Sequence, residues 1–374
     1  MARFGKSFAD PLFEIYGGVV ARPNAFGPHI VPRKKRALRV GAPEVYSVRT
    51  ADSTEVRLTR FKGGNKGPVL LAPGFGTSTL AFSIDTIDTN FPEFLYANGF
   101  DVFLFDYRAS PDLPSAKTQF TLDDIATKDY PAAVAKAIEV SGARDVQVVA
   151  HCVGSMTFLM SMMSGLKGVR SAVCSALAFY PISPTVNEVK AGLDMGSFLT
   201  VLGIDTMTTG YNPDNWQDKL GDAVLKLAPA KEKCNSPVCR RILMMYGEVF
   251  KHEQLNAATH DAVHEMFGVA NLSAFKHISL MVRKGQIVDR DGKDVYLPNI
   301  SRVNIPITFL HGAENRLFLI EGTKKSFRYI SEKNGPEKYL HLTIPNYAHM
   351  DMFIGKNAAK NVFPEVLLEL EKHG

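Results

Sequence analysis

The chain contains 374 residues, of which 45% are hydrophobic and 22% are charged, and its formal net charge is +5. This balance excludes a disordered or fibrous chain and is typical of a folded globular protein. Much of the positive charge lies in residues 33–36 and at Arg39. We interpret this run as a solvated loop or, alternatively, as a contact for an acidic partner or a membrane surface. No nucleic-acid-binding motif accompanies it, so we expect no nucleic-acid partner.

Residues 1–43 are expected to form an N-terminal extension that precedes the folded core. Charged residues interrupt the apolar residues of the first twenty positions, which therefore lack the continuous apolar stretch of a secretion signal. No apolar stretch of the chain is long enough to cross a bilayer. These observations predict a cytoplasmic protein without a transmembrane segment.

Buried strands and helices are expected to alternate between residues 44 and 184. Two runs rich in Val, Thr and Arg within residues 44–61 indicate a hairpin. Apolar runs then alternate with helical patterns, which is typical of a parallel sheet with helical crossovers. The expected strands are residues 68–72, 101–105, 145–149 and 173–179, and the expected helices are residues 91–98, 122–140 and 156–163.

This alternation stops after Pro184 and resumes near residue 305. Residues 185–300 have mostly helical patterns and contain the only tryptophan, Trp216, so we expect them to form an inserted, mainly helical cap. The core, residues 44–184 and 301–374, is expected to be a mostly parallel sheet flanked by helices. Its last expected strands are residues 305–310 and 339–344, and its last expected helices are residues 322–334 and 364–372.

The most informative motif follows the strand at residues 145–149 and reads Ala150-His151-Cys152-Val153-Gly154-Ser155. A nucleophile on a strand–turn–helix elbow is typical of the α/β-hydrolase fold, whose usual turn is Gly-x-Ser-x-Gly. Here Cys152 occupies the nucleophile position. A helix N-terminus attracts negative charge and lowers the pKa of a cysteine, so we expect a thiolate at Cys152. The alternative interpretation is a small buried cysteine at a turn.

The catalytic base is expected late in the chain, because the order in this fold is nucleophile, acid, histidine. His349 fits this order, since it lies in a loop directly after the last expected strand. We predict that His349 is the general base. Asp351 is too close to it in sequence to be the acid, and we interpret it as a brace for the loop.

The third member of the site is expected after the strand at residues 305–310. The usual carboxylate position, three residues after Gly312, holds Asn315, and Glu314 stands one residue earlier. A thiolate paired with an imidazolium needs only an amide to orient the histidine, as in Cys-His-Asn proteases. We therefore favour Asn315 as the orienting residue, with Glu314 as one alternative and a simple Cys-His dyad as another.

An oxyanion hole requires two backbone N–H groups directed at the developing charge. The residue after the nucleophile, Val153, supplies one of them. The second is expected in the loop after the strand at residues 68–72, where Gly74-Phe75-Gly76 permits close approach. We predict the N–H of Phe75; the alternative is that these glycines only form a turn.

The remaining cysteines and histidines are given structural interpretations. Cys174 lies in an apolar run and is expected in the core. Cys234 and Cys239 could pair locally, although a cytoplasmic protein favours thiols, and whether they pair is left open. We predict no metal site, since no second ligand pair shows zinc spacing. His151 and His311 are expected to be structural.

Four segments together give the core a resemblance to the acid-lipase branch of the α/β-hydrolases. They are residues 68–76, 124–132 (Asp-Ile-Ala-Thr-Lys-Asp-Tyr-Pro-Ala), 150–155 and 344–355 (Ile-Pro-Asn-Tyr-Ala-His-Met-Asp-Met-Phe-Ile-Gly). The resemblance implies Cys152 as nucleophile, His349 as base, and Phe75 and Val153 as oxyanion donors. Acid lipases carry Ser at position 152, Asp at position 315 and usually His at position 73, where this chain has Cys152, Asn315 and Pro73. These departures argue against simple triglyceride hydrolysis.

A cysteine in a lipase-like core is also similar to polyhydroxyalkanoate synthases and dienelactone hydrolases. Within the cap, residues 237–241 and 259–268 resemble hydrolase-like regions associated with flavin-dependent oxidoreductases of the cholesterol-oxidase type. That resemblance says little about the substrate, and no cofactor is indicated.

The motif and its partners predict an acyl hydrolase that forms a thioester at Cys152 and acts on an ester, lactone or thioester. An acyltransferase or a cyclising enzyme with the same intermediate is the alternative, and a non-catalytic binding protein with this fold is the second. We expect a small, apolar acyl substrate, with Trp216, Met245 and His260 of the cap as candidate binding residues. Met and aromatic residues at such spacing equally suit a cap core. The oligomeric state cannot be read from the sequence.

Overall fold

The computed structural model describes residues 33–184, 205–227 and 234–374, together with two short paired strands, β1 (Ile15–Tyr16) and β2 (Val19–Val20). Its centre is an eight-stranded sheet with the order β12-β11-β8-β7-β5-β6-β4-β3. The strands are β3 (Pro43–Arg49), β4 (Glu55–Phe61), β5 (Pro68–Ala72), β6 (Asp101–Asp106), β7 (Val146–His151), β8 (Val169–Ser175), β11 (Ile307–Gly312) and β12 (Tyr339–Ile344). The expected hairpin is confirmed as the antiparallel pair β3–β4.

The sheet is parallel from β6 to β12, and only β3 and β4 run antiparallel to their neighbours. Strand β7 lies between β5 and β8, and every residue of β5, β6 and β7 is buried. Strands that are covered on both faces consist of continuous apolar runs. The predicted bounds of these three strands are therefore close to the observed ones. The carboxyl end of β7, where Cys152 follows, is therefore fixed by a neighbouring strand on each side.

Helices cover the sheet where the apolar periodicity predicted them. Helix α2 begins with a capping box between Asn90 and Glu93, which fixes its first residue. The expected helix at residues 122–140 is interrupted, since α3 is followed by a π-helical turn at residues 125–129 and then by α4. The core helices are α1 (Leu80–Ser83), α2 (Phe91–Ala97), α3 (Leu122–Asp124), α4 (Tyr130–Ser141), α5 (Val153–Met163), α13 (Ile320–Asn334), α14 (Asp351–Ile354), α15 (Ala358–Asn361) and α16 (Phe363–Lys372).

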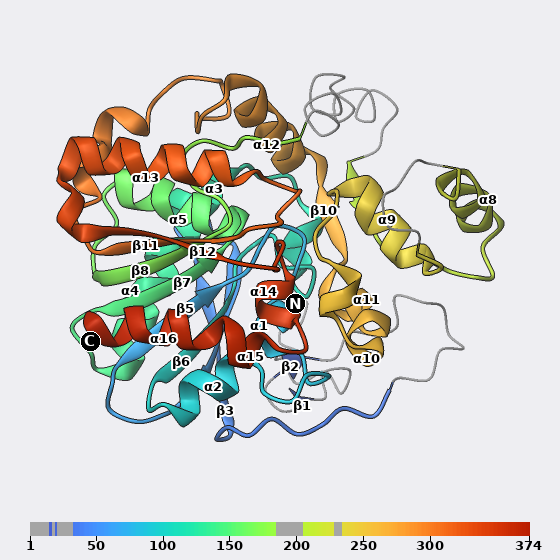
Figure 1. Ribbon diagram of the computed structural model, residues 1–374, viewed down its shortest axis with the longest axis horizontal. Coiled ribbons are helices and arrows are strands. Elements are labelled where there is room, and N and C mark those ends of the chain that lie inside the picture. Colours follow the sequence, from blue (N-terminus) through green and yellow to red (C-terminus); the bar gives the residue numbers. More distant parts are fainter. Residues whose placement is uncertain (1–14, 17–18, 21–32, 185–204, 228–233) are drawn as a thin grey trace, which may run out of the picture.

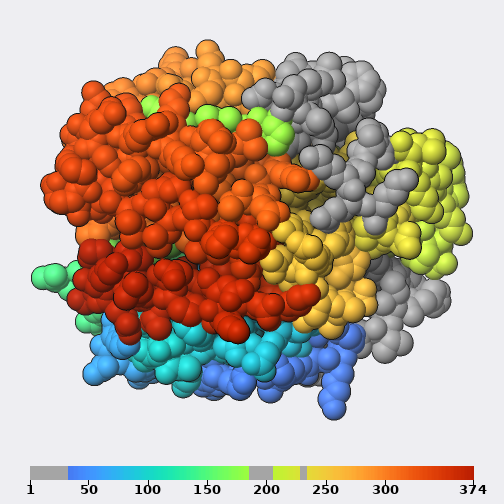
Figure 2. Space-filling view, in the orientation of Figure 1, coloured from blue at the N-terminus to red at the C-terminus, as the bar shows by residue number. Residues whose placement is uncertain are grey.

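The described part of the segment between β8 and β11 forms α8 (Trp216–Leu225), α9 (Pro237–Met245), α10 (Ala257–Asp261), α11 (Val263–Met266) and α12 (Leu272–Lys284), with the strand pair β9 (Thr206–Thr208) and β10 (Val269–Asn271). Figure 1 shows α8 to α11 gathered at one end of the central strands, with α8 farthest from the sheet. In Figure 2 the yellow and gold atoms of this region lie directly against the orange and red surface of the C-terminal part. Thr77, in the loop after β5, bridges to Phe267, so the region contacts the core beside that loop.

The basic run at residues 33–36 is a loop in which Lys34 is exposed and both arginines are paired within the chain. Arg33 lies 2.5 Å from Asp85 of the core and 2.6 Å from Glu265 of α11, and Arg36 lies 2.5 Å from the buried carboxylate of Glu93. The expectation of a free basic surface is wrong here, because the carboxylates that meet these guanidinium groups belong to the chain itself and are largely buried. Among the described residues, no helix combines the length and the apolarity that crossing a membrane requires.

Candidate active site

Cys152 stands on a strained turn between β7 and α5. Its φ is 56° and its ψ is −126°, a conformation that non-glycine residues rarely adopt. Two backbone hydrogen bonds hold the turn: Cys152 N–H donates to Ser175 O at 2.9 Å, and Met156 N–H donates to Cys152 O at 3.1 Å. The side chain is thereby directed away from the sheet at the start of α5, the position that the sequence motif predicts for a nucleophile.

Two glycines allow the turn to approach the loop after β5. A Cβ added to Gly154 would lie 2.3 Å from Pro73 O, and one added to Gly74 would lie 3.2 Å from the Cβ of Cys152. The first distance is impossible for a real side chain, so position 154 requires glycine. This close packing brings the Phe75 loop and the Cys152 turn together.

The backbone N–H groups of Val153 and Phe75 lie close enough to the Cys152 sulfur to lower the pKa of its thiol. These are the two groups that the sequence singled out as oxyanion donors. Burial nevertheless raises the pKa of the Cys152 thiol to about 12, because the loss of solvent outweighs the two N–H groups. Cys152 is 7% exposed, and this burial opposes the resting thiolate that the helix start was expected to favour.

Two buried tyrosines fix the backbone on either side of the sulfur. The hydroxyl of Tyr107 donates to Pro73 O at 3.0 Å, and that of Tyr130 donates to Gly154 O at 2.6 Å. Burial raises the pKa of both phenols well above the ordinary value, so both remain donors. Neither bond could be predicted from the sequence, because each joins residues 24 or more positions apart.

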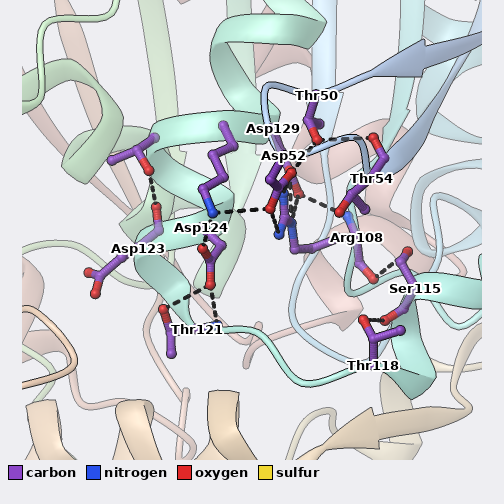
Figure 3. Close-up of polar contacts among 12 residues, drawn as sticks. Thr50, Asp52, Thr54, Arg108, Ser115, Thr118, Thr121, Asp123, Asp124 and Asp129 are labelled. Carbon is purple, nitrogen blue, oxygen red and sulfur yellow. Dashed lines mark hydrogen bonds and ion pairs between the residues drawn. The ribbon is translucent and has the colours of Figure 1, made fainter.

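Arg108 connects the segments that carry these tyrosines. It lies 2.7 Å from Asp129 of the π-helical turn and 2.9 Å from Asp52 of the β3–β4 hairpin, as Figure 3 shows. Arg108 follows Tyr107 directly, and Asp129 precedes Tyr130 directly. The ion pair therefore holds the two tyrosines at a fixed separation, although burial raises the pKa of Asp129 to about 6. The motif at residues 124–132 thus contains a positioning element for the site.

His349 lies in the loop between β12 and α14 and is 1% exposed. Its Nδ1 lies 3.0 Å from the Asn315 side-chain nitrogen. The Asn315 side-chain oxygen accepts from the backbone N–H groups of Leu317 at 3.0 Å and Phe318 at 3.2 Å. These two bonds fix the orientation of the amide, so Asn315 donates to His349 Nδ1 and the neutral ring carries its hydrogen on Nε2.

The donor direction at His349 is the reverse of that in a Ser-His-Asp triad, where the acid accepts from the histidine. Burial, together with His151 and His311, holds the pKa of His349 well below its usual range. The His151 ring centroid lies 4.5 Å away, and burial lowers the pKa of His151 to about 3. Burial therefore favours the neutral ring of His349 over the imidazolium that a thiolate–imidazolium pair requires. Within the described part of the chain, no hydrogen bond joins His349 to Cys152.

The other candidate for the third position points away from His349. The Glu314 carboxylate is 41% exposed and lies 2.8 Å from the ammonium group of Lys251. Asp351 braces the loop, since it accepts from Ala348 N–H at 2.9 Å, and burial raises its pKa to about 7.

The three candidate binding residues of the cap are not gathered at Cys152. Trp216 is 69% exposed on α8, and His260 Nε2 lies 3.2 Å from the sulfur of Cys234. Met245 is partly buried against the core. The next residue, Tyr246, instead reaches the oxyanion loop, where a Cβ on Gly76 would lie 1.9 Å from its hydroxyl oxygen.

A second polar cluster lies outside this site. The ligand-type atoms of Cys234, Cys239, His252 and His260 all lie within 4.8 Å of one another. Cys234 and Cys239 are not joined by a disulfide. Ligand spacing in the sequence does not predict this cluster, because His252 and His260 belong to separate elements, a 3₁₀ turn (His252–Gln254) and α10.

The chain has the α/β-hydrolase fold. A solved α/β-hydrolase, GrgF from Penicillium sp. sh18, superposes with a TM-score of 0.53 at 13% sequence identity, and the match covers 89% of this chain and 99% of that chain. No family model matches the sequence.

Two curated relatives are similar over most of the chain. Lipase lipl-1 of Caenorhabditis elegans is 23% identical over 366 residues, which covers 88% of this chain and 89% of that protein. Probable lipase C14C8.15 of Schizosaccharomyces pombe is 23% identical over 362 residues, which covers 87% of this chain and 75% of that protein.

Proposed function

We propose that this protein is an acyl hydrolase that acts through a thioester at Cys152. The observation that carries the proposal is the strained elbow of Cys152 packed against the loop of Phe75, where a Cβ on Gly74 would lie 3.2 Å from the Cβ of Cys152. A carbonyl carbon bonded to the Cys152 sulfur would place its oxygen within reach of the Phe75 and Val153 N–H groups. The similarity to two lipases supports the same class of reaction.

An apolar acyl group suits the surroundings of the oxyanion loop. The Phe75 ring contacts that of Phe275 with centroids 5.0 Å apart, and Tyr246 stacks near Phe275 at 5.5 Å. Phe267 lies 5.6 Å from Tyr246 on its other side. These aromatic side chains come from the region between β8 and β11 and border the loop that supplies the Phe75 donor. We infer that they, rather than Trp216 and His260, contact the acyl chain.

The reaction requires His349 to accept a proton at Nε2, which the resting tautomer does not allow. The ring must first carry its hydrogen on Nδ1, with the Asn315 amide oxygen turned toward it. That rotation breaks the two bonds from Leu317 and Phe318 N–H, at about 1–3 kcal/mol for each. We therefore expect slow turnover, with a step before attack that depends on Asn315.

From that tautomer the chemistry balances without another reactant. Nε2 takes the thiol proton as Sγ bonds to the acyl carbon, and the carbonyl electrons move to the oxygen between Phe75 and Val153. The imidazolium returns the proton to the leaving group, whose bond to carbon breaks, and the thioester remains. Water then adds to the thioester and loses a proton to Nε2. Finally Sγ leaves, takes that proton back, and releases the acid.

The test is intact-protein mass spectrometry after exposure to p-nitrophenyl esters and acyl-coenzyme A thioesters of increasing chain length. We expect an acyl adduct on the wild-type chain and acid release, both absent in Cys152→Ala and both present in the control Cys174→Ala, since Cys174 is buried in β8. Hydrolysis that persists in Cys152→Ala would overturn the nucleophile. A folded chain without an adduct from any donor would favour a binding protein. Adding an alcohol or an amine distinguishes an acyltransferase by its ester or amide product.

A further inference from the structure

The side chains of Cys234, Cys239, His252 and His260 point toward a common centre. The sulfur of Cys234 lies 3.2 Å from His260 Nε2, and the sulfur of Cys239 lies 3.3 Å from His252 Nε2. The four atoms lie within 4.8 Å of one another, and the two imidazole ring centroids are 5.2 Å apart. Two independent thiol–imidazole contacts would not need to lie side by side, so the proximity of all four side chains calls for a further explanation.

The two sulfur–nitrogen distances are close to an edge of a tetrahedron around a zinc ion. Zinc bonds of about 2.3 Å to sulfur and about 2.0 Å to nitrogen place those atoms about 3.5 Å apart at tetrahedral angles. The observed separations of 3.2 and 3.3 Å fall a few tenths of an ångström below that value. Two cysteines and two histidines form a donor set that suits zinc, because thiolate and imidazole are both preferred ligands of this ion.

The surroundings of Cys234 and Cys239 resemble the support that metal-ligating cysteines receive. Ser236 N–H donates to the sulfur of Cys234 at 3.4 Å, and the Ser236 hydroxyl caps α9 by accepting from Cys239 N–H at 3.3 Å. An N–H group directed at a sulfur favours the thiolate that a metal binds. Arg240 holds the same turn, since it donates to Cys234 O at 2.6 Å.

The histidines are oriented from outside the cluster as well. The Asp261 carboxylate lies 3.6 Å from His260 Nδ1, on the side of the ring away from Cys234. The Phe250 ring contacts the His252 ring edge-on at 5.3 Å. Both imidazoles therefore present Nε2 to the cysteines. A carboxylate behind a histidine is a common outer neighbour at zinc sites.

We propose that Cys234, Cys239, His252 and His260 bind one structural zinc ion. All four positions are filled by the chain, so no coordination site remains open for a substrate or a water molecule. The ion would join the start of α9 to the 3₁₀ turn at His252 and to α10. Helix α9 ends beside Tyr246, which approaches Gly76 of the oxyanion loop. The zinc ion would thus fasten the helix that carries Tyr246 toward Cys152, whatever reaction Cys152 performs.

The direct test measures zinc in the full-length chain, purified without a histidine tag or chelator from zinc-supplemented medium. We expect about one zinc ion per chain by mass spectrometry of the metal, and less than about a tenth of that in Cys239→Ala and in His260→Ala. Matched controls are Cys174→Ala, a buried thiol of β8, and His264→Ala, four residues from His260. Both controls are expected to keep the wild-type content.

A second measurement uses the wild-type chain, because the ligand variants could fail to fold. The chelator-treated chain is titrated with Co²⁺, and the site predicts the visible absorption of tetrahedral cobalt with a thiolate charge-transfer band, together with a higher thermal transition. Equal zinc in the wild type and in Cys239→Ala would overturn the proposal. So would a folded chain that binds neither metal, or a Cys234–Cys239 disulfide in protein purified without oxidant.

Discussion

The surroundings of Cys152 and the Cys/His cluster (Cys234, Cys239, His252 and His260) are assembled in different ways. At Cys152 the main chain does the positioning, because β7 ends, turns and starts α5 within three residues. In the cluster, three short elements bring side chains together without any shared sheet. The elbow at Cys152 is formed by consecutive residues, whereas the Cys/His cluster is formed by residues that only folding brings together.

The two kinds of assembly differ in what keeps their residues in place. The buried parallel sheet holds the site around Cys152 rigidly. Backbone N–H groups can therefore serve there as fixed donors, and few side chains are needed. A region of short helices has little core of its own and gains from a cross-link such as a metal ion. Substitutions around Cys152 test the rigidity of the core, and a pair of glycine substitutions compares the core with the region of short helices.

The largest effect is expected from Cys152→Ser. Both the thiol and a serine hydroxyl must give their proton to His349 Nε2, but the hydroxyl is a much weaker acid and depends more on a carboxylate behind the histidine, where Asn315 supplies only an amide. We expect acyl release to fall by about 10³-fold or more, comparable to the loss when a triad aspartate becomes an amide. Steady-state kinetics measures it, with Cys152→Ser/Asn315→Asp as the partner variant that recovers part of the rate. Full activity in the single variant would show that the hydroxyl does not depend on a carboxylate behind the histidine.

The next effect concerns stability and pH at Asp351. Burial raises the pKa of this carboxyl from 3.8 to about 7, so the folded chain favours its neutral form. The unfolded chain ionises earlier, and the free energy of unfolding therefore decreases as pH rises from 4.5 to 7, by about 3 kcal/mol. Asp351→Asn cannot ionise, and we expect urea unfolding of this variant to lose that part of the decrease. Identical slopes in the two chains would contradict the assignment.

A pair of glycine substitutions compares the two regions directly. Gly154→Ala forces a Cβ to within 2.3 Å of Pro73 O and should reduce the free energy of unfolding by about 2 kcal/mol or more. Gly221→Ala, within α8, meets its nearest side chain only at 3.9 Å and should increase stability by about 0.5–1 kcal/mol. Thermal and urea unfolding measure both. The contrast fails if both variants shift the midpoint in the same direction.

The smallest effect is a gain. In Asn315→Asp one carboxylate oxygen keeps the Leu317 and Phe318 N–H groups, and the other can accept from His349 Nδ1–H. His349 Nε2 then becomes the acceptor, its pKa rises, and the thiol ionises more easily. We expect iodoacetamide to alkylate Cys152 about tenfold faster at pH 7, a difference of about 1.4 kcal/mol. An unchanged rate, with Cys152→Ala as the blank, would mean that Asn315 does not limit the thiol.

Much of the core could be predicted because its signals are local. Strands β5 and β12 begin and end at residues 68–72 and 339–344, as expected. Strand β5 is a buried, continuous apolar run, and β12, at the edge of the sheet, alternates polar with apolar residues. Cys152, His349 and Asn315 could be located for the same reason, because each directly follows a recognisable strand. Their roles as nucleophile, base and orienting residue stay predictions.

The features that the sequence did not predict depend on contacts between residues far apart in the chain. The basic residues 33–36 could not be assigned, since their partners Asp85, Glu93 and Glu265 lie 49 to 232 positions away. His252 and His260 could not be grouped with the two cysteines from the sequence, because fixed ligand spacing does not reach across separate elements. Tyr246 was passed over for its neighbour Met245, because which of two adjacent residues faces the core depends on how α9 is placed.

The sequence by itself therefore determined the α/β-hydrolase fold, the elbow and the chain order of its candidate site, since these follow from periodicity and turn chemistry within a few residues. Only the tertiary structure decided the charge state and proton direction of that site. Desolvation of Cys152 and His349, and the two backbone N–H groups that orient Asn315, arise from parts of the chain brought together by folding. The elbow fixes where the sulfur stands, and the burial of the sulfur by its surroundings favours the thiol over the thiolate.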